Sequence, residues 1–373
     1  MTTQERSREI VEGLLAKARI KINGTGDADV QVHNPELFHR VLQQGSLGLG
    51  ESYMAGWWDC KRLDIFFELL LRHKIDEQAP KNIHDLAHIA IARVANLQSK
   101  KRAPIVGRKH YDLGNDLFFR MLDSHMQYSC GYWKNATNLE EAQQAKLRLI
   151  CDKLHLTADM RVLDIGCGWG GLAYYMAKNY GVSVVGVTIS AEQQKMAQDR
   201  CAGLPVDIRL QDYRDLDEQF DRIVSVGMFE HVGPKNYNTY FKVVDTNLKE
   251  NGLFLLHTIG AKRTGHNVDP WIDRYIFPNG CLPSVKQISA ASESHFIMED
   301  WHNFGADYDS TLMAWYERFN ASWDEISSNY TPTFRRMFNY YLLCCAGAFR
   351  ARDIQLWQVM FSRGKKGGLQ VAR

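Results

Sequence analysis

The sequence has no uninterrupted apolar run of about 18 residues, the length that a helix needs to cross a bilayer. Its eight cysteines include no C-x-x-C pair and no zinc-type spacing, and no apolar signal stretch opens the chain. We therefore expect reduced thiols, no bound metal and a cytoplasmic location, with any membrane contact being peripheral. A formal net charge of only +2 argues against nucleic acid as a partner.

The chain of 373 residues is long enough for two domains. Apolar side chains recur at helical spacing in three early stretches: 35–45, 62–72 and 83–97. The first helix is expected to end at Gly45, and the glycine- and aromatic-rich stretch 47–60 is expected to be a packed loop. The basic, proline-containing stretch 99–104 predicts a boundary between a small, mainly helical domain at 1–100 and a larger domain at 101–373.

From about residue 140 the pattern alternates between strand and helix, which predicts an α/β domain with a mostly parallel sheet covered on both faces. Seven strands are expected: Arg161–Ile165, Ser183–Thr188, Val206–Leu210, Phe220–Val226, Leu253–Ile259, Phe296–Trp301 and Gln355–Ser362. The last two are expected to form a hairpin-like addition at the sheet edge. An insertion near 261–290 follows the fifth strand, where such folds build substrate sites.

Glycines follow the first of these strands directly, in VLDIGCGWGG at 162–171. Asp164, Gly166, Gly168 and Gly170 lack the G-x-G-x-x-G spacing of a dinucleotide site, and no phosphate-binding loop is present. The D-x-G-x-G pattern resembles the first motif of the S-adenosylmethionine-dependent methyltransferase fold, a Rossmann-like fold. Glycines let the backbone approach the amino-acid end of that cofactor, and a nearby carboxylate can bind its ammonium group. A purely structural glycine turn is the alternative.

The ends of the next two strands supply candidates for the nucleoside part of the cofactor. The second strand ends in Thr188 where most such enzymes have Asp or Glu, so Thr188 and Gln193 are expected to bind the ribose, unless they only cap the next helix. Gln211, Asp212 and Tyr213 follow the third strand and are expected to border the adenine.

Two motifs of nucleic-acid methyltransferases are absent. The sequence contains no Pro-Pro, which excludes the [DN]-P-P-[YF] motif of amino-directed enzymes. It also contains no Cys-Pro, the nucleophile motif of enzymes that methylate C5 of cytosine. The methyl acceptor is therefore not expected to be nucleic acid.

Several stretches in one order resemble the cyclopropane-fatty-acyl-phospholipid synthases, and the resemblance covers essentially the whole chain. They are ESYMAGWW (51–58), HYDLGND (110–116), MQYSCGYW (126–133), VLDIGCGWGG, VVGVTIS (184–190), DRIVSVGMFEHVG (221–233), LLHTIG (255–260), FPNGCLPS (277–284) and CAGAFR (345–350). The resemblance implies that the methyl group of S-adenosylmethionine is transferred to the cis double bond of an unsaturated phospholipid acyl chain. Loss of a proton then closes a cyclopropane ring.

The base implied by the resemblance is a bound bicarbonate, held by Cys130, Glu230, His257, the backbone of Ile259, and Tyr308. A tyrosine hydroxyl, an imidazole and a backbone N–H can donate to such an anion, while Glu230 can accept its hydroxyl proton. Taken singly, Glu230 and His231 could cap a helix and His257 could be a core histidine.

The resemblance also implies that Tyr128 and Ser129 reach the cofactor's carboxylate and that Cys167 lies in the cofactor site. Cys345 matches an active-site cysteine, but no covalent step needs a thiolate, so it can equally line an acyl channel. Aromatic rings that could stabilise a carbocation, or simply belong to the core, are Tyr128, Tyr132, Trp133, Phe229, Tyr308 and Phe349.

Contact with the inner face of the membrane is expected to use the basic residues at 100–102, 108 and 109 and an apolar stripe, although these charges could be ordinary solvated surface. The domain at 1–100 is expected to dock lipid or to dimerise, and a homodimer is an expectation from the family. Two alternatives remain open. One is another S-adenosylmethionine enzyme that branches lipids or methylates a soluble molecule; the other is a non-catalytic lipid-binding protein.

Overall fold

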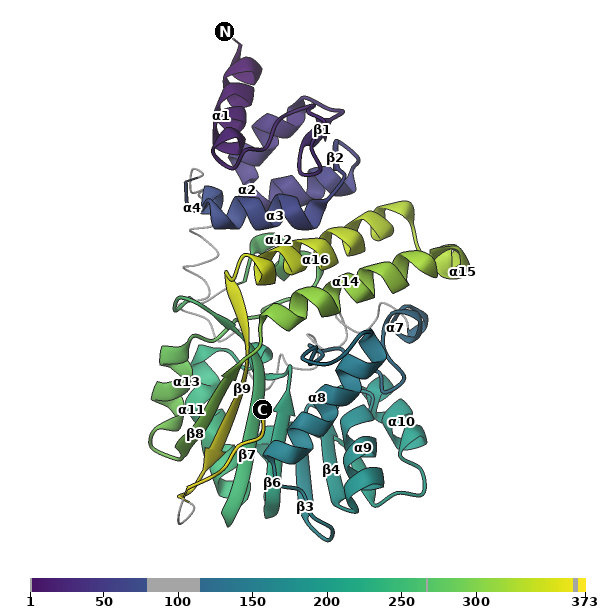
Figure 1. Ribbon diagram of the computed structural model, residues 1–373, viewed down its shortest axis with the longest axis vertical. Helices are drawn as coiled ribbons and strands as arrows, with labels where there is room; N and C mark the ends of the chain where they lie inside the picture. Colours follow the sequence, from purple (N-terminus) through teal and green to yellow (C-terminus); the bar gives the residue numbers. More distant parts are fainter. Residues whose placement is uncertain (1, 79–114, 266–267, 365–367) are drawn as a thin grey trace. The chain divides into compact units, whose positions relative to one another are not determined.

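The computed structural model describes residues 2–78, 115–265, 268–364 and 368–373, which form two compact units (Figure 1). The predicted helix at 83–97, the boundary at 99–104, most of the HYDLGND stretch and the basic residues at 100–102, 108 and 109 lie outside the described residues. No helix in the described ranges combines the length and the apolar character needed to cross a membrane.

The first unit combines the described residues 2–78 with two later segments, 268–278 and 308–354. Its elements are α1 (Thr3–Lys17), β1 (Val30–Val32), α2 (Glu36–Met54), β2 (Trp58–Cys60), α3 (Leu63–Arg72), α4 (Ile75–Gln78), α12 (Pro270–Tyr275), most of α14 (Ala306–Ala321), α15 (Trp323–Ile326) and α16 (Pro332–Arg350). This unit therefore draws on three separate stretches of the chain.

Aromatic packing and a buried ion cluster join the early helices to α16 within this unit. The Tyr53 ring lies 5.2 Å from Trp58 and 5.5 Å from Tyr340. Arg350 donates to Asp309 and to Asp64, whose carboxylate is almost fully buried. The segment 308–354 thus supplies the apolar and charged partners that the N-terminal helices need.

One local expectation for the first unit is confirmed and one is wrong. The helical geometry of α2 breaks at Gly45, as expected, with a φ of 58° and a ψ of −134° that glycine adopts without strain, and a second helical stretch runs to Met54. The stretch 47–60, expected to be a loop, is therefore largely helical, and it ends in the short strand β2, which pairs antiparallel with β1.

The second unit contains the predicted seven-stranded sheet. Its strands are β3 (Arg161–Ile165), β4 (Ser183–Thr188), β5 (Val206–Leu210), β6 (Phe220–Val226), β7 (Leu248–Ala261), β8 (Ile297–Asn303) and β9 (Ile354–Ser362), in the order β5-β4-β3-β6-β7-β9-β8. The first five strands pair in parallel, while β8 and β9 pair antiparallel at one edge. The α/β class, the strand positions and the added edge pair are confirmed.

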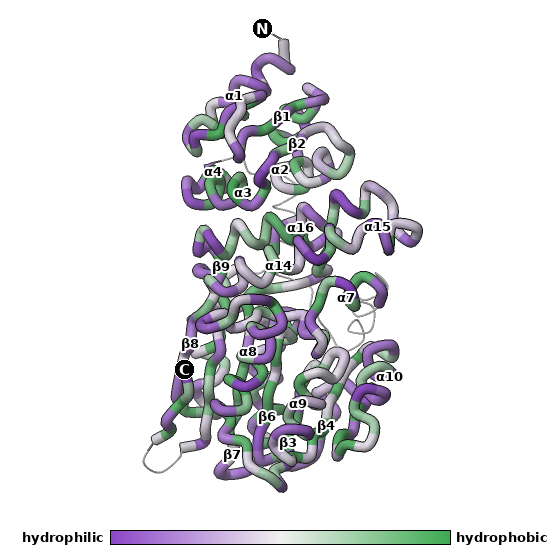
Figure 2. The backbone as a smooth tube through the Cα atoms, turned by 45° about the vertical axis from the view of Figure 1, so that its right-hand side comes forward, coloured by the Kyte–Doolittle hydropathy of each residue, from purple (hydrophilic) through white to green (hydrophobic). Residues whose placement is uncertain are grey.

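Helices cover both faces of this sheet (Figure 1). They are α7 (Asn115–Met121), α8 (Leu139–Lys153), α9 (Gly171–Tyr180), α10 (Ala191–Arg200), α11 (Tyr237–Asn247) and α13 (Val285–Ser292). The strands β3, β4, β6, β7 and β9 contribute residues to two cores, one with α8, α9 and α10 and one with α11 and α13. Figure 2 shows β6 and β7 largely hydrophobic, as expected for strands buried on both faces.

Candidate functional site

The glycine turn after β3 has the shape that a small ligand needs. Gly166, Gly168 and Gly170 have φ values of 85°, 54° and 77°, which side chains other than glycine rarely adopt. Asp164, at 2% exposure, lies beneath the turn, and its Oδ2 atom has no hydrogen-bond partner among the described residues. Burial raises the pKa of Asp164 to about 7, because the carboxylate loses its contact with water. A cationic group of a ligand, such as the ammonium of S-adenosylmethionine, would offset that cost by pairing with the carboxylate.

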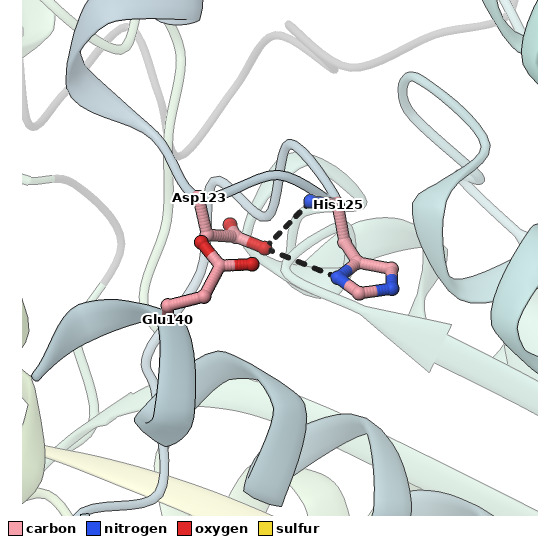
Figure 3. Close-up of side chains that lie close together, drawn as sticks. All are labelled: Asp123, His125 and Glu140. Atoms are coloured by element: carbon pink, nitrogen blue, oxygen red, sulfur yellow. Dashed lines mark hydrogen bonds and ion pairs between the residues drawn. The ribbon is translucent and has the colours of Figure 1, made fainter.

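A loop between α7 and α8 lies against this turn and carries Tyr128, Ser129 and Cys130. Its start is fixed by Asp123, which accepts the N–H groups of His125 and Gln127 at 2.9 and 2.8 Å (Figure 3). Gly171, the first residue of α9, packs directly against this loop. A Cβ at this position would overlap the carbonyl oxygen of His125. The loop and the glycine turn are therefore packed backbone against backbone.

Asp123, His125 and Glu140 lie close together (Figure 3), and their potential metal-binding atoms lie within 4.8 Å of one another. Both carboxylates already accept donors from the loop, Glu140 from the backbone and hydroxyl groups of Ser124. Burial lowers the pKa of His125, which favours its neutral form. These bonds explain the cluster as a clamp that shapes the loop.

Lys146 of α8 lies under the same loop and was missed by the sequence reasoning. Its side chain is fully buried, and its Nζ donates to Gln127 Oε1 at 2.5 Å and to Ser129 Oγ at 3.0 Å. Burial lowers the pKa of Lys146 to about 8. The available signal was a polar residue at an apolar position of the helix, since Lys146 lies between the buried Ala142 and Ile150.

The residues predicted to hold the nucleoside lie at the carboxyl ends of β4 and β5. The Thr188 hydroxyl donates to Gln193 Oε1 at 3.0 Å, and both side chains are buried. The N-cap of α10 is Ser190, whose hydroxyl accepts the backbone N–H of Gln193, so the side chain of Gln193 takes no part in the cap. This pair leaves the amide N–H₂ of Gln193 as the donor that a ribose hydroxyl could use.

After β5 the predicted adenine residues are held by their own neighbours. The carboxylate of Asp212 accepts Arg214 Nε and Nη2 at 2.8 and 2.6 Å, and Gln211 donates to a backbone carbonyl. The Tyr213 ring packs edge-on against Tyr240 at 5.4 Å. These contacts orient a short wall of polar and aromatic side chains beside the pair formed by Thr188 and Gln193.

Glu230 lies in a short 3-10 turn after β6, 7% exposed. Its Oε1 accepts the backbone N–H of Ile259 at 2.7 Å, while Oε2 has no hydrogen-bond partner within the described ranges. Burial raises the pKa of Glu230 to about 7, against the opposing effect of the Ile259 N–H. The Ile259 N–H, expected to donate to bicarbonate, is thus donated to Glu230, and one carboxylate oxygen of Glu230 remains available to a ligand.

His257 lies on β7 opposite Val226, the last residue of β6, and its carbonyl accepts the N–H of Gly227. Its Nδ1 contacts the Gln358 amide at 3.2 Å, and its buried Nε2 has no hydrogen-bond partner in the described part of the chain. Burial, with the nearby charges of Lys146 and Lys153, lowers the pKa of His257 well below its usual value. Because the Gln358 amide N–H₂ donates to Nδ1, the neutral ring carries its hydrogen on Nε2, which can donate one hydrogen bond.

The predicted site cysteines and Tyr308 are divided between the two units. Cys130 is fully buried, and burial raises the pKa of the buried Cys167 thiol well above its usual range, so a thiolate is disfavoured there. Tyr308 and Cys345 belong to the first unit, where the Tyr308 ring packs 4.5 Å from Phe349. Phe229 stacks on Tyr237 at 4.4 Å inside the core, which supports its core interpretation.

Comparison with known proteins agrees with this geometry. Residues 98–359 match the family model described as mycolic acid cyclopropane synthetase. The chain is 72% identical, over 98% of its length and 95% of the relative, to the cyclopropane-fatty-acyl-phospholipid synthase of Escherichia coli K12. It is 33% identical to the tuberculostearic acid methyltransferase UfaA1 of Mycobacterium tuberculosis, over 90% of this chain and 84% of the relative.

Two solved structures support the same assignment. The cyclopropane synthase MmaA2 of Mycobacterium tuberculosis is 29% identical, with a TM-score of 0.66, over 72% of this chain and 99% of that one. The mycolic acid cyclopropane synthase CmaA1, solved with S-adenosylhomocysteine, is 31% identical with a TM-score of 0.65, over 69% and 97% of the two chains. The chain therefore belongs to the cyclopropane synthetase family of S-adenosylmethionine-dependent methyltransferases.

Proposed function

We propose that this protein is an S-adenosylmethionine-dependent enzyme that converts the cis double bonds of unsaturated phospholipid acyl chains into cyclopropane rings, with bound bicarbonate as the base. The observation that carries this proposal is a pair of buried, unsatisfied polar atoms, Glu230 Oε2 and His257 Nε2, at neighbouring strand ends among the described residues. Such atoms cost free energy unless a ligand pairs with them. The 72% identity to a phospholipid enzyme supports the acceptor class.

The roles of the cofactor site follow from its donors and acceptors. S-adenosylmethionine supplies an electrophilic methyl group when bound. Asp164 would hold its ammonium group, Tyr128 and Ser129 its carboxylate, and Gln193 its ribose. An alkene cannot be activated by deprotonation, so these residues act by orienting the methyl group toward the double bond in a site without water.

Bicarbonate would supply the base that removes the proton before ring closure. His257 Nε2 can donate to this anion, and Glu230 Oε2 can accept its hydroxyl proton, which raises the basicity of the anion. Cys130, buried in the same unit, is proposed to line this pocket, while the single N–H of Ile259 holds Glu230 in place. The burial of both Glu230 and His257 excludes water, which would otherwise capture a carbocation as an alcohol.

The proposal is tested with S-adenosylmethionine that carries a labelled methyl group and vesicles of unsaturated phospholipid, with and without bicarbonate. We expect label in a cyclopropane-containing lipid by mass spectrometry, and a large loss of product when bicarbonate is removed. Equal product without bicarbonate would return the role of base to Glu230 or His257. Label in a methyl-branched lipid, or no label in lipid, would contradict the proposed reaction.

The proposed role of Glu230 predicts a pH dependence. Its carboxylate must be ionised to accept a proton, and burial raises its pKa to about 7. At saturating S-adenosylmethionine and constant free bicarbonate, the rate should therefore reach half of its maximum near pH 7, level off about one pH unit above it, and fall about tenfold per pH unit well below it. A rate that is flat from pH 5.5 to 8 would contradict this role.

The family also supports peripheral contact with the inner face of the membrane and a homodimer, both of which we include in the proposal. Co-sedimentation with vesicles of increasing anionic lipid content measures the first, because electrostatic attraction to lipid weakens with salt. Analytical ultracentrifugation measures the second. An alternative acceptor, a soluble small molecule, would leave vesicle lipids unlabelled.

A further inference from the structure

A fully buried lysine lies beside the proposed cofactor site with only neutral hydrogen-bond partners. Two of the three N–H bonds of Lys146 Nζ are accepted by Gln127 Oε1 and Ser129 Oγ. Among residues 2–78, 115–265, 268–364 and 368–373, no carboxylate makes an ion pair with it. An ammonium group that is removed from water without a counter-ion is costly, so an anionic ligand close to it is strongly favoured.

The contact with Ser129 determines which way that hydroxyl can act. A serine hydroxyl has one hydrogen to donate, and the Lys146 ammonium already donates to its oxygen at 3.0 Å. The hydroxyl hydrogen must then point away from Lys146, toward another acceptor. Gln143 Nε2 also donates to the Ser129 carbonyl at 2.7 Å, which holds the backbone of this residue in place.

The surroundings match the two charges of an amino acid. Asp164 offers a buried oxygen without a hydrogen-bond partner, and Lys146 offers a buried cation without a direct ion pair, within the described residues. The charges of Asp123 and Asp164 act on Lys146 without contact. A zwitterion with an ammonium group and a carboxylate would satisfy both.

We propose that Lys146 is a positioning residue for the amino-acid end of S-adenosylmethionine: it fixes the Ser129 hydroxyl as a donor to the cofactor's carboxylate and supplies the positive charge beside it. The inference rests on the proposed use of S-adenosylmethionine. It goes further in assigning carboxylate recognition to a charge on α8 that lies outside the glycine motif.

Helix α8 offers a matched control. Lys153 lies two turns after Lys146 and is also fully buried, but it contacts His302 Nδ1 at 3.0 Å and lies 3.8 Å from Asp300. Lys146→Met and Lys153→Met therefore each remove one buried ammonium group from the same helix. Only the first change removes it from the proposed cofactor site.

The test compares binding of S-adenosylhomocysteine and of 5′-methylthioadenosine, which lacks the amino-acid end, by calorimetry on the full chain. For Lys146→Met we expect S-adenosylhomocysteine affinity to fall about 10- to 100-fold, as for loss of a charged hydrogen bond, with methylthioadenosine affinity within about twofold of wild type. Lys153→Met should leave both affinities within about twofold. A general structural role for Lys146 would lower the affinity for both ligands by the same factor, and that result would overturn the proposal.

Lys146→Gln keeps an N–H donor for Ser129 without the charge and serves if Lys146→Met does not fold. We expect it to lose S-adenosylhomocysteine affinity selectively as well; wild-type affinity in this variant would overturn the role of the charge. Failure of the wild-type protein to bind S-adenosylhomocysteine would instead overturn the proposed function. A wild-type protein that binds it and variants that bind equally well would overturn only the inference.

Discussion

Glu230→Gln is expected to lower the rate of ring formation about 10²- to 10⁴-fold, the range typical of a lost acid–base group. The amide oxygen of the variant can still accept the Ile259 N–H at the position of Oε1. The amide N–H₂ then replaces Oε2 and donates where the carboxylate accepts, so a bound anion loses the acceptor for its proton. Methyl transfer into vesicle lipid, followed by mass spectrometry, measures the effect.

The same variant should retain the fold and the cofactor site. Glu230 lies outside the glycine turn, so S-adenosylhomocysteine affinity should stay within about twofold of wild type. Glu293→Gln, an exposed position on the C-terminal side of α13, is the matched control and should keep full activity. Wild-type activity in Glu230→Gln would show that this carboxylate does not take part in the reaction.

Gly171→Ala should damage stability and cofactor binding together. A Cβ at this position would overlap the carbonyl oxygen of His125 and lie 2.6 Å from Gln127 Nε2. Because the obstacle is backbone, the loop must move as a whole, at a cost of about 1–3 kcal/mol in the free energy of unfolding. Movement of the loop would also separate Ser129 from Lys146, so we expect at least a tenfold loss of S-adenosylhomocysteine affinity.

Thermal or urea unfolding and calorimetry measure the two effects of Gly171→Ala. Gly13→Ala in α1 provides the comparison, since its Cβ would meet nothing within 4 Å. That change should stabilise the helix by up to about 1 kcal/mol, because alanine has the higher helix propensity. If Gly171→Ala unfolds like wild type and binds the ligand normally, the loop does not press on the turn as the structure indicates.

Much of the catalytic unit was predictable because its signals are local. The strands β3 to β6 have the predicted bounds. Most of their buried positions are apolar, since parallel strands in the middle of a sheet are covered on both faces, whereas β5 at the edge alternates between apolar and charged residues. The glycines after β3 adopt positive φ values that few other residues tolerate, so their motif predicts the turn. Glu230 follows β6, and His257 lies within β7 opposite Val226, the last residue of β6, so the topology brings both to the same end of the strands.

Lys146 illustrates what a local pattern cannot decide. A lysine in a polar helix is ordinarily a solvated surface residue, and α8 contains several charged side chains. Only the packing of the loop that carries Gln127 and Ser129 over this face of the helix buries the ammonium completely. The functional interpretation of Lys146 thus depends on a contact between residues 17 positions apart in the chain.

The sequence by itself determined the α/β class, the order of strands and helices, the cofactor turn and the family, because each depends on residue spacing within short segments. The tertiary structure alone decided that a second helical stretch follows the break at Gly45, and that residues 308–354 share a core with the N-terminal helices. Those outcomes depend on side chains such as Arg350 and Tyr340 meeting partners nearly 300 positions away. Contacts at that separation leave no periodic pattern in the sequence, since their free energy is realised only when the chain is packed.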